Sequence, residues 1–385
     1  MRKENWTYKK LGEVCDSELG KTLNSSKDKG ELRPYLCAVN VLWDKFDLSI
    51  LKETRFEEDE LDRYSVKKGD LLVCEGGDVG RAAIWNDETV IQYQNALHRI
   101  RFKGDVIPRF CLFYLRHLKD NGTLDAKYAK GVTIKHLVKS SLLSIPIPIP
   151  PIKEQEEICS LLDKLSLVIE KKKQQVKELD NLAQAIFYDM FGDPVENEKG
   201  WEVKKMGDVA PAVEYKGKHP QIANKYWLLN LDKVEAQTGR ILSIDYYDYE
   251  EIGNSVVSFD KTNVLYSKLR PYLNKVVVPT QIGYATSELV PLQPNASLLD
   301  RQYIAYMLRS KLFVDYISGK VAGAKMPRVT MSVFRDFKVP IPPLSLQQSF
   351  AQKVEFIERQ KELINQSIRE AQTLFDSRME YYFGE

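Results

Sequence analysis

The sequence predicts an α+β fold: two α/β domains with pseudo-twofold symmetry, separated by two long antiparallel coiled-coil helices. The first observation is an internal repeat, in which Ile149-Pro150-Pro151-Ile152 returns 192 residues later as Ile341-Pro342-Pro343-Leu344. The second is a heptad pattern of roughly 35 residues that follows each copy. A repeat this long is too large for a solenoid, so each copy is a domain followed by a helix.

The repeat sets the expected boundaries along the chain. We expect a first domain at 1–152, a spacer helix at 153–193, a second domain at 194–344 and a second spacer helix at 345–385. Trp6–Val14 and Trp201–Val209 open the two domains with similar residues. Alternating apolar segments predict strands, and apolar residues at helical spacing predict helices. The strands are expected at Tyr35–Val39, Asp70–Cys74, Ser144–Pro148, Tyr226–Leu231, Asn263–Ser267 and Phe337–Pro340, and the helices at Pro108–Leu118 and Arg301–Ile317.

Each long helix carries a seam of apolar residues at alternating spacings of four and three, which is typical of a coiled coil. Ser345 with Gln348 predicts a capping box at the start of the second helix, and Gly192 predicts the end of the first. We expect the two seams to bury each other and to form an antiparallel rod between two globular ends; the alternative is that each helix packs on its own domain. The seam residues are Ile158, Leu162, Leu165, Ile169, Val176, Leu179 and Ile186 in the first helix, and Phe350, Val354, Ile357, Ile364, Ile368 and Phe375 in the second.

Composition narrows the class of protein. A hydrophobic content of 43% and a charged content of 29% are those of a globular chain, and no apolar run approaches the length of a membrane span. No signal peptide is visible behind Met1-Arg2-Lys3. The five cysteines include no CxxC pair, so we expect reduced thiols, a cytoplasmic protein and no metal site.

The sequence offers no catalytic residues. Gly20-Lys21-Thr22 lacks the upstream glycine of a P-loop, and we interpret it as a basic loop. Gly76–Arg81 lacks the spacing of a dinucleotide-binding motif and predicts a tight turn that presents Arg81. Glu214-Tyr215-Lys216 resembles part of a nuclease motif but has no counterpart in the other half.

Basic residues gather in spans without acids, although the net charge is only +2. Such spans are typical of a surface that binds a polyanion, and arginine, lysine and asparagine can contact phosphates or base edges. A solvated charged surface, or core packing for the aromatic residues, is the alternative. The candidate DNA-binding residues are Lys21, Lys27, Lys29, Arg33, Arg81, Lys127, Lys130, Lys135, Lys216, Lys218, Lys268, Arg270, Asn274, Lys275, Lys320, Lys325 and Arg328.

In their order and duplication these motifs resemble the specificity subunit of Type I restriction–modification systems. The resemblance extends over the whole chain and includes Val264–Tyr272 and Met190–Pro194. It implies two target-recognition domains that each read one half of a bipartite double-stranded DNA target. It also implies assembly with two modification (methyltransferase) subunits and with restriction subunits. S-adenosylmethionine, ATP and Mg are expected on those partners, with no cofactor bound by this chain.

The two halves of the chain differ in the segments that are expected to contact the DNA bases. Residues 21–60 and 216–250 barely align, although the flanking segments match, which predicts an asymmetric target. The function expected is therefore a non-catalytic, sequence-specific DNA-binding subunit. The alternatives are a self-contained DNA methyltransferase or nuclease with a degenerate active site, and a coiled-coil adaptor that does not bind DNA.

Overall fold

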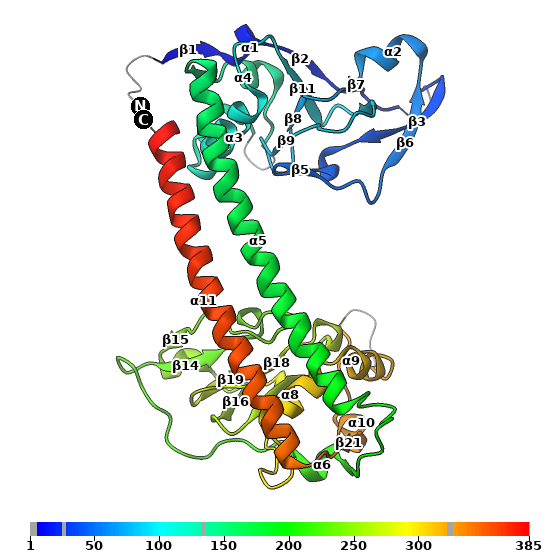
Figure 1. Cartoon of the computed structure of the whole chain (residues 1–385), viewed down its shortest axis with the longest axis vertical. Coiled ribbons are helices and arrows are strands. Elements are labelled where there is room, and N and C mark those ends of the chain that lie inside the picture. The colour runs from blue at the N-terminus through cyan, green and yellow to red at the C-terminus, as the bar shows by residue number, and fades with distance from the viewer. Residues whose placement is uncertain (1–5, 25–27, 132–134, 322–325, 385) are drawn as a thin grey trace. The chain divides into compact units, whose positions relative to one another are not determined.

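The computed structural model describes residues 6–24, 28–131, 135–321 and 326–384, and the chain forms two compact units (Figure 1). Unit 1 comprises Met1–Lys171 with Ile368–Glu385, and unit 2 comprises Lys172–Ser367. Each long helix is therefore shared between the units. The boundaries expected from the repeat divide the chain differently and stay predictions.

Unit 1 is built from short strands and a few helices. Its strands are β1 (Thr7–Lys10), β2 (Cys15–Leu19), β3 (Glu31–Leu36), β4 (Val41–Leu42), β5 (Lys45–Phe46), β6 (Lys52–Phe56), β7 (Ser65–Val66), β8 (Leu71–Cys74), β9 (Ala82–Ile84), β10 (Ile91–Tyr93), β11 (Leu97–Phe102) and β12 (Pro146–Ile149). Its helices are α1 (Leu11–Val14), α2 (Glu58–Arg63), α3 (Pro108–Asp120), α4 (Lys139–Leu143) and the first half of α5 (Ile152–Phe191).

Unit 2 repeats most of these elements. Its strands are β13 (Val203–Lys205), β14 (Tyr226–Leu229), β15 (Tyr246–Tyr247), β16 (Val256–Phe259), β17 (Val264–Ser267), β18 (Val276–Val277), β19 (Gly283–Thr286), β20 (Leu289–Leu292) and β21 (Lys338–Pro340). Its helices are α6 (Met206–Val209), α7 (Tyr249–Ile252), α8 (Arg301–Arg309), α9 (Lys311–Ser318), α10 (Met331–Asp336), the second half of α5 and most of α11 (Leu344–Phe383).

The sheets show that the two units share most of their topology. Unit 1 contains sheets with strand orders β1-β12, β6-β3-β10-β7 and β2-β11-β8-β9, and unit 2 contains β13-β21, β15-β14-β19-β16 and β18-β17-β20. In both units the middle pair of one four-stranded sheet is parallel, β3 with β10 in β6-β3-β10-β7 and β14 with β19 in β15-β14-β19-β16. The internal repeat of the sequence is thus a repeat of the fold.

Each domain packs on both long helices. In unit 1, Phe383 near the end of α11 lies 5.3 Å from Phe110 of α3, between ring centroids, and Ile158 of α5 belongs to the same core. In unit 2, Phe187 of α5 lies 5.8 Å from Tyr303 of α8 and 5.7 Å from Phe350 of α11. The seam residues therefore contact domain cores as well as the other helix, which combines the two alternatives posed above.

The helices run antiparallel within unit 2. Lys361 of α11 pairs with Asp180 of α5, whereas the earlier Phe350 contacts the later Phe187 and Phe191. None of the predicted seam residues is exposed, and Ile158, Leu162, Ile169, Phe350, Val354, Ile357 and Phe375 are buried. The end of α5 is as predicted, because Gly192 takes a φ of +76° and donates its N–H to Tyr188 O.

Several predicted bounds differ from the structure by one or two residues, as at β12, and four larger differences each have a local reason. The helix expected at Arg301–Ile317 is two helices, because Ser310 takes an extended ψ of 139° and its hydroxyl caps α9 at Phe313 N. The capping box at Ser345 is absent, because α11 already begins at Leu344. The strands expected at Tyr35–Val39 and Tyr226–Leu231 end earlier, because 3-10 turns occupy Ala38–Asn40 and Leu231–Lys233. Within the described residues, no helix is long and apolar enough to cross a membrane.

Candidate nucleic-acid interface

In unit 2, one basic segment forms the turn between β17 and β18, at Lys268–Lys275. Arg270 is exposed, and Tyr272 keeps 50% of its surface accessible. Among the described residues, neither side chain has a hydrogen-bond or ion-pair partner. This turn therefore presents a guanidinium and an aromatic ring together at the surface.

The other side chains of this turn point inward and hold it. Asn274 is buried and donates its side-chain amide to Arg309 O at 2.8 Å and to Gln237 Oε1 at 3.2 Å. The Lys275 ammonium donates to Leu231 O at 2.6 Å. Asn274 and Lys275, predicted to bind DNA, are thus positioning residues in this structure.

A second basic segment lies against the turn. The backbone of Arg270 donates to Pro327 O at 2.8 Å, and Val329 donates to Lys268 O at 2.8 Å. This neighbour lies between α9 and α10, in the same part of the chain as the candidate residues Lys320 and Arg328. Lys320 is exposed and sits over the Tyr316 ring, whereas Arg328 is bound to Glu288 at 2.8 Å.

Unit 1 has the same arrangement of two segments. The turn after β8 is bound by the segment that precedes α4, because Leu137 donates its N–H to Glu75 O at 2.7 Å. Leu137 stands at the repeat position of Val329. Buried His98 donates from Nε2 to Leu137 O at 2.7 Å, and burial lowers the pKa of His98. The exposed lysines of this loop are Lys127, Lys130 and Lys135, the last of which donates to Asp125 O. Leu137 in unit 1 and Val329 in unit 2 therefore make matching backbone contacts, each with the turn that follows the equivalent strand.

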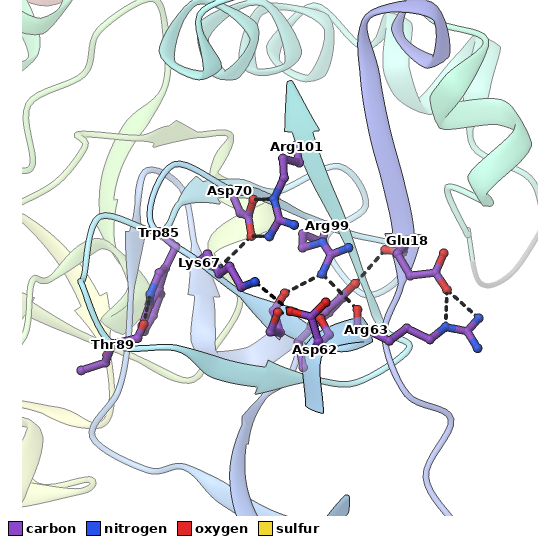
Figure 2. A network of polar contacts seen from close by, with 11 residues as sticks. Glu18, Asp62, Arg63, Lys67, Asp70, Trp85, Thr89, Arg99 and Arg101 are labelled. Carbon is purple, nitrogen blue, oxygen red and sulfur yellow. Dashed lines mark hydrogen bonds and ion pairs between the residues drawn. The ribbon is translucent and has the colours of Figure 1, made fainter. Parts of the chain in front are cut away.

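A network of cations and carboxylates covers the flank of unit 1 beside β11 (Figure 2). Arg101 binds Asp70 through two hydrogen bonds of 2.7 and 2.6 Å. Arg63 binds Glu18 through two bonds of 2.9 and 2.7 Å. Lys67 contacts Asp62 at 2.8 Å, and Arg99 donates to Ser65 O at 2.6 Å.

Sequence reasoning missed these cations. Arg63 and Lys67 stand among acidic residues, whereas Arg99 and Arg101 lie in the acid-free stretch 89–104, which was the signal that could have found them. Folding gathers them, and the carboxylates fix their directions. The side chains of Arg63, Lys67 and Arg101 remain 63%, 47% and 40% exposed, so their outer edges can still meet a phosphate.

Aromatic side chains gather at the four-stranded sheet of unit 2, β15-β14-β19-β16. His219 stacks on Tyr284 with ring centroids 3.9 Å apart and planes 7° apart, and Tyr226 lies 5.9 Å from Tyr284. Burial lowers the pKa of His219. The exposed Lys216 and Lys218 precede this stack. Flat rings suit stacking with nucleobases, and exposed lysines that stand close by in the sequence suit contacts with phosphates.

Two predicted DNA-binding residues of unit 1 are not at the surface. Lys21 is buried, with its ammonium 2.6 Å from Glu60 Oε2 and 3.5 Å from Asp28 Oδ1, so the basic loop interpreted at Gly20-Lys21-Thr22 does not present this ammonium at the surface. Arg81 turns inward and donates to Ala38 O at 2.7 Å. The expectation that the turn at Gly76–Arg81 presents this arginine to a ligand is therefore wrong.

The remaining predicted residues fall into three groups. Lys29, Arg33, Lys216 and Lys218 are exposed, and Arg33 pairs with Glu31. Lys268 is half-buried. Lys27 and Lys325 lie outside the described residues.

The described residues contain no group of three or more His, Cys, Asp or Glu side chains that could hold a metal ion. The five cysteines are buried and unpaired. Burial raises the pKa of the Cys15 and Cys74 thiols to about 11, so these two are protonated at neutral pH.

Comparison with known proteins gives a consistent result. A family model described as the Type I restriction modification DNA specificity domain matches the chain twice, at residues 3–180 and 198–373. The Type I restriction enzyme EcoDI specificity subunit of Escherichia coli is 19% identical over 403 residues, covering 95% of this chain and 84% of that protein. The MjaVIII specificity subunit of Methanocaldococcus jannaschii is 23% identical over 383 residues, covering 92% of this chain and 86% of that protein.

Solved structures share the fold. The S subunit of a Type I restriction–modification system from M. genitalium matches with a TM-score of 0.56 and 14% identity, over 97% of this chain and 95% of that chain. A chain solved in work on complex assembly and conformational transition of the type I R-M system matches with a TM-score of 0.58 and 16% identity, over 99% of this chain and 98% of that chain.

Proposed function

This chain belongs to the family of Type I restriction modification DNA specificity domains, and from that membership we propose how it reads DNA. It is a specificity subunit with two target-recognition domains, which binds DNA and assembles with modification and restriction subunits. We propose that each domain reads one half of a bipartite target and that the two halves differ in sequence.

The observation that carries this proposal is one topology with two different exposed surfaces. Unit 1 exposes the carboxylate-ordered cations around Arg63 and Arg101, whereas unit 2 exposes Arg270, Tyr272 and the aromatic stack on Tyr284. Direct reading of bases depends on the kind and direction of side-chain groups. Two surfaces of different chemistry therefore support two different half-sites.

We also propose that the chain itself is not an enzyme. In this proposal the partners hold S-adenosylmethionine, ATP and Mg, and this chain binds no cofactor. The relatives named above are specificity subunits, so a self-contained methyltransferase or nuclease has no support among them. A coiled-coil adaptor without DNA contacts also leaves the two different surfaces unexplained.

The modification subunits are proposed to dock on the long helices. In unit 2, a groove of about 420 Å³ between α5 and α11 is lined by apolar side chains that include Leu179, Leu182 and Phe356. Phe356 is 64% exposed and Leu182 is 47% exposed. Exposed apolar surface of this kind marks a protein interface. Leu374 of unit 1 occupies the repeat position of Leu182 and is 44% exposed, which supports one docking surface per unit.

The experiment is to express the chain with its modification subunit and to map methylated bases across the host genome. We expect one bipartite motif with two different halves. Exchange of residues 1–152 for the corresponding segment of another specificity subunit should change one half of the motif and leave the other unchanged. A change in both halves, or no sequence-specific methylation by the complex, would contradict the proposal.

A further inference from the structure

We propose that Arg270 and Tyr272 form the base-reading pair of the second target-recognition domain, held in place by a strained turn. This inference rests on the proposed function and adds the residues, the kind of base and the half-site. The base pair read contains guanine, whose major-groove edge matches a guanidinium. The turn at Lys268–Lys275 supplies the rigid backbone that supports this contact.

The first argument is that Arg270 differs from the other arginines nearby. Arg240 is bound to Glu235 at 3.0 Å, and Arg328 is bound to Glu288 at 2.8 Å. Arg309 donates to Val276 O at 2.6 Å. Arg270 alone in this group is exposed and lacks a described partner for its guanidinium. Its donors are therefore available to a ligand.

The second argument is backbone strain. Among the described residues, seven non-glycine residues have a positive φ, and three of them meet here: Gln237 at +69°, Arg270 at +50° and Asn274 at +50°. Asparagine tolerates the left-handed region, but arginine and glutamine rarely enter it. Strained residues persist only where the surroundings hold them, and they concentrate at functional sites.

The third argument is that other segments clamp the turn. Gln237 donates its N–H to Leu273 O and its side-chain amide to Tyr272 O, both at 3.0 Å. The Pro327 carbonyl accepts from Arg270 N at 2.8 Å. Gly239 makes this approach possible, because a Cβ built there would lie 1.7 Å from Val276 O. Contacts from two other loops therefore fix the backbone from which the side chains of Arg270 and Tyr272 project.

The rigid backbone at Arg270 favours base reading over phosphate binding. A phosphate can be neutralised by a mobile side chain such as the exposed Lys216 or Lys218, since charge alone suffices. A guanine edge requires the planar guanidinium to approach O6 and N7 in one direction. An exposed Tyr272 two residues away adds a flat contact beside that base.

The pair belongs to unit 2 alone. In unit 1 the equivalent turn runs through Gly76, Gly77, Asp78 and Gly80, and its arginine, Arg81, is bound inward to Ala38 O. The effect of Arg270 should therefore appear in one half of the motif. This asymmetry separates a reading role from a general loss of affinity.

The test uses the full complex with the modification subunits and duplexes that carry the mapped motif or one substituted base pair. The complex with Arg270→Gln should discriminate about ten- to one-hundred-fold less between the motif and a duplex substituted at one G·C pair in the half-site of the second domain. The other half-site should keep its discrimination. Tyr272→Ala should weaken discrimination at the same or the adjacent pair. Arg335→Gln, which changes another exposed arginine of unit 2, is the matched control and should behave like the unchanged complex.

Thermal unfolding of each variant complex checks that the fold is retained. An equal loss of affinity for all duplexes would make Arg270 a phosphate contact and overturn the inference. Unchanged discrimination, or a second half-site without a G·C pair, would also overturn it. If the unchanged complex showed no sequence preference at all, the proposed function would fail instead.

Discussion

Equivalent residues of the two domains show how one fold carries different surface chemistry. Asp70 and Asn263 stand at the same position, are both 1% exposed, and accept from backbone N–H groups at 2.8 and 2.9 Å. Asp70 binds the guanidinium of Arg101, whereas Asn263 donates to the amide oxygen of Gln293 at 3.1 Å. The turn is preserved, and an ion pair in one domain is replaced by an amide pair in the other.

A buried glutamine ties each long helix to its domain. Gln155 is fully buried; its Oε1 accepts from Ile107 N at 2.9 Å, and its Nε2 donates to Asp105 O and Pro150 O at 2.9 Å. We predict that Gln155→Ala lowers the free energy of unfolding by about 2–4 kcal/mol, because three backbone groups lose the hydrogen bonds of a fully buried side chain. Urea unfolding, followed by circular dichroism, measures this.

Gln174→Ala is the control on the same helix, because Gln174 is exposed and, within the described part of the chain, its side chain bonds only to Glu178. It should change the free energy of unfolding by less than about 0.5 kcal/mol. Equal effects of the two substitutions would show that the buried hydrogen bonds contribute nothing.

The same glutamine shows how far the sequence could lead. Gln155 and Gln347 are visible as a repeat, and Gln347 makes the matching bonds to Asp300 N, Leu298 O and Pro342 O. Their role could not be predicted, because most of their partners lie 47 to 50 residues away. Arg270 was a candidate from its basic span, but the clamp by Gln237 depends on a loop that no pattern connects to it.

At the scale of elements, the apolar periodicity predicted the two long helices but not what they contact. The seam positions near the helix ends pack into domain cores, as Phe375 does against Phe113 at 6.3 Å between ring centroids. Periodicity reports which face of a helix is buried and does not identify the neighbour. The split at Ser310 was missed for a related reason, since both α8 and α9 are apolar on one face.

The heptad position between Ile357 and Ile364 of α11 is a lysine, Lys361, which pairs with two carboxylates. The side chain of Lys361 is 8% exposed, and its ammonium lies 2.6 Å from Asp180 of α5 and 2.8 Å from Glu358. Burial alone would lower the pKa of Lys361, but the two carboxylates raise it above its usual value. This ion pair joins α5 to α11 and can fix their register within unit 2.

We predict that the two carboxylates substitute for each other. Asp180→Ala should cost about 1 kcal/mol, because Glu358 still neutralises the ammonium. Asp180→Ala with Glu358→Ala should cost about 3 kcal/mol or more, since an unpaired charge then stays buried. Adding Lys361→Met to the double variant should restore most of this loss. Additive effects in unfolding measurements would contradict a shared role.

At the scale of the whole molecule, two units of equal topology are joined by helices that both units share. α5 and α11 each contain 40 residues, and each contributes to both cores. Because each domain also carries its own exposed surface, the half-sites can change independently while the helices stay the same. The helices should then determine how many unspecified base pairs separate the half-sites.

This role can be tested by lengthening both helices by one heptad, after Val176 in α5 and after Ile364 in α11. A heptad preserves the phase of the seam. Seven residues at a rise of 1.5 Å add about 10 Å, which corresponds to about three base pairs of DNA at 3.4 Å each. We predict that methylation mapping of the lengthened complex finds the same two half-sites, including the G·C pair assigned to Arg270, separated by about three more base pairs. Binding should weaken, because three base pairs also rotate one half-site about the DNA axis relative to the other. An unchanged gap would show that the helices do not set the spacing, and altered half-sites would show that they contribute to reading.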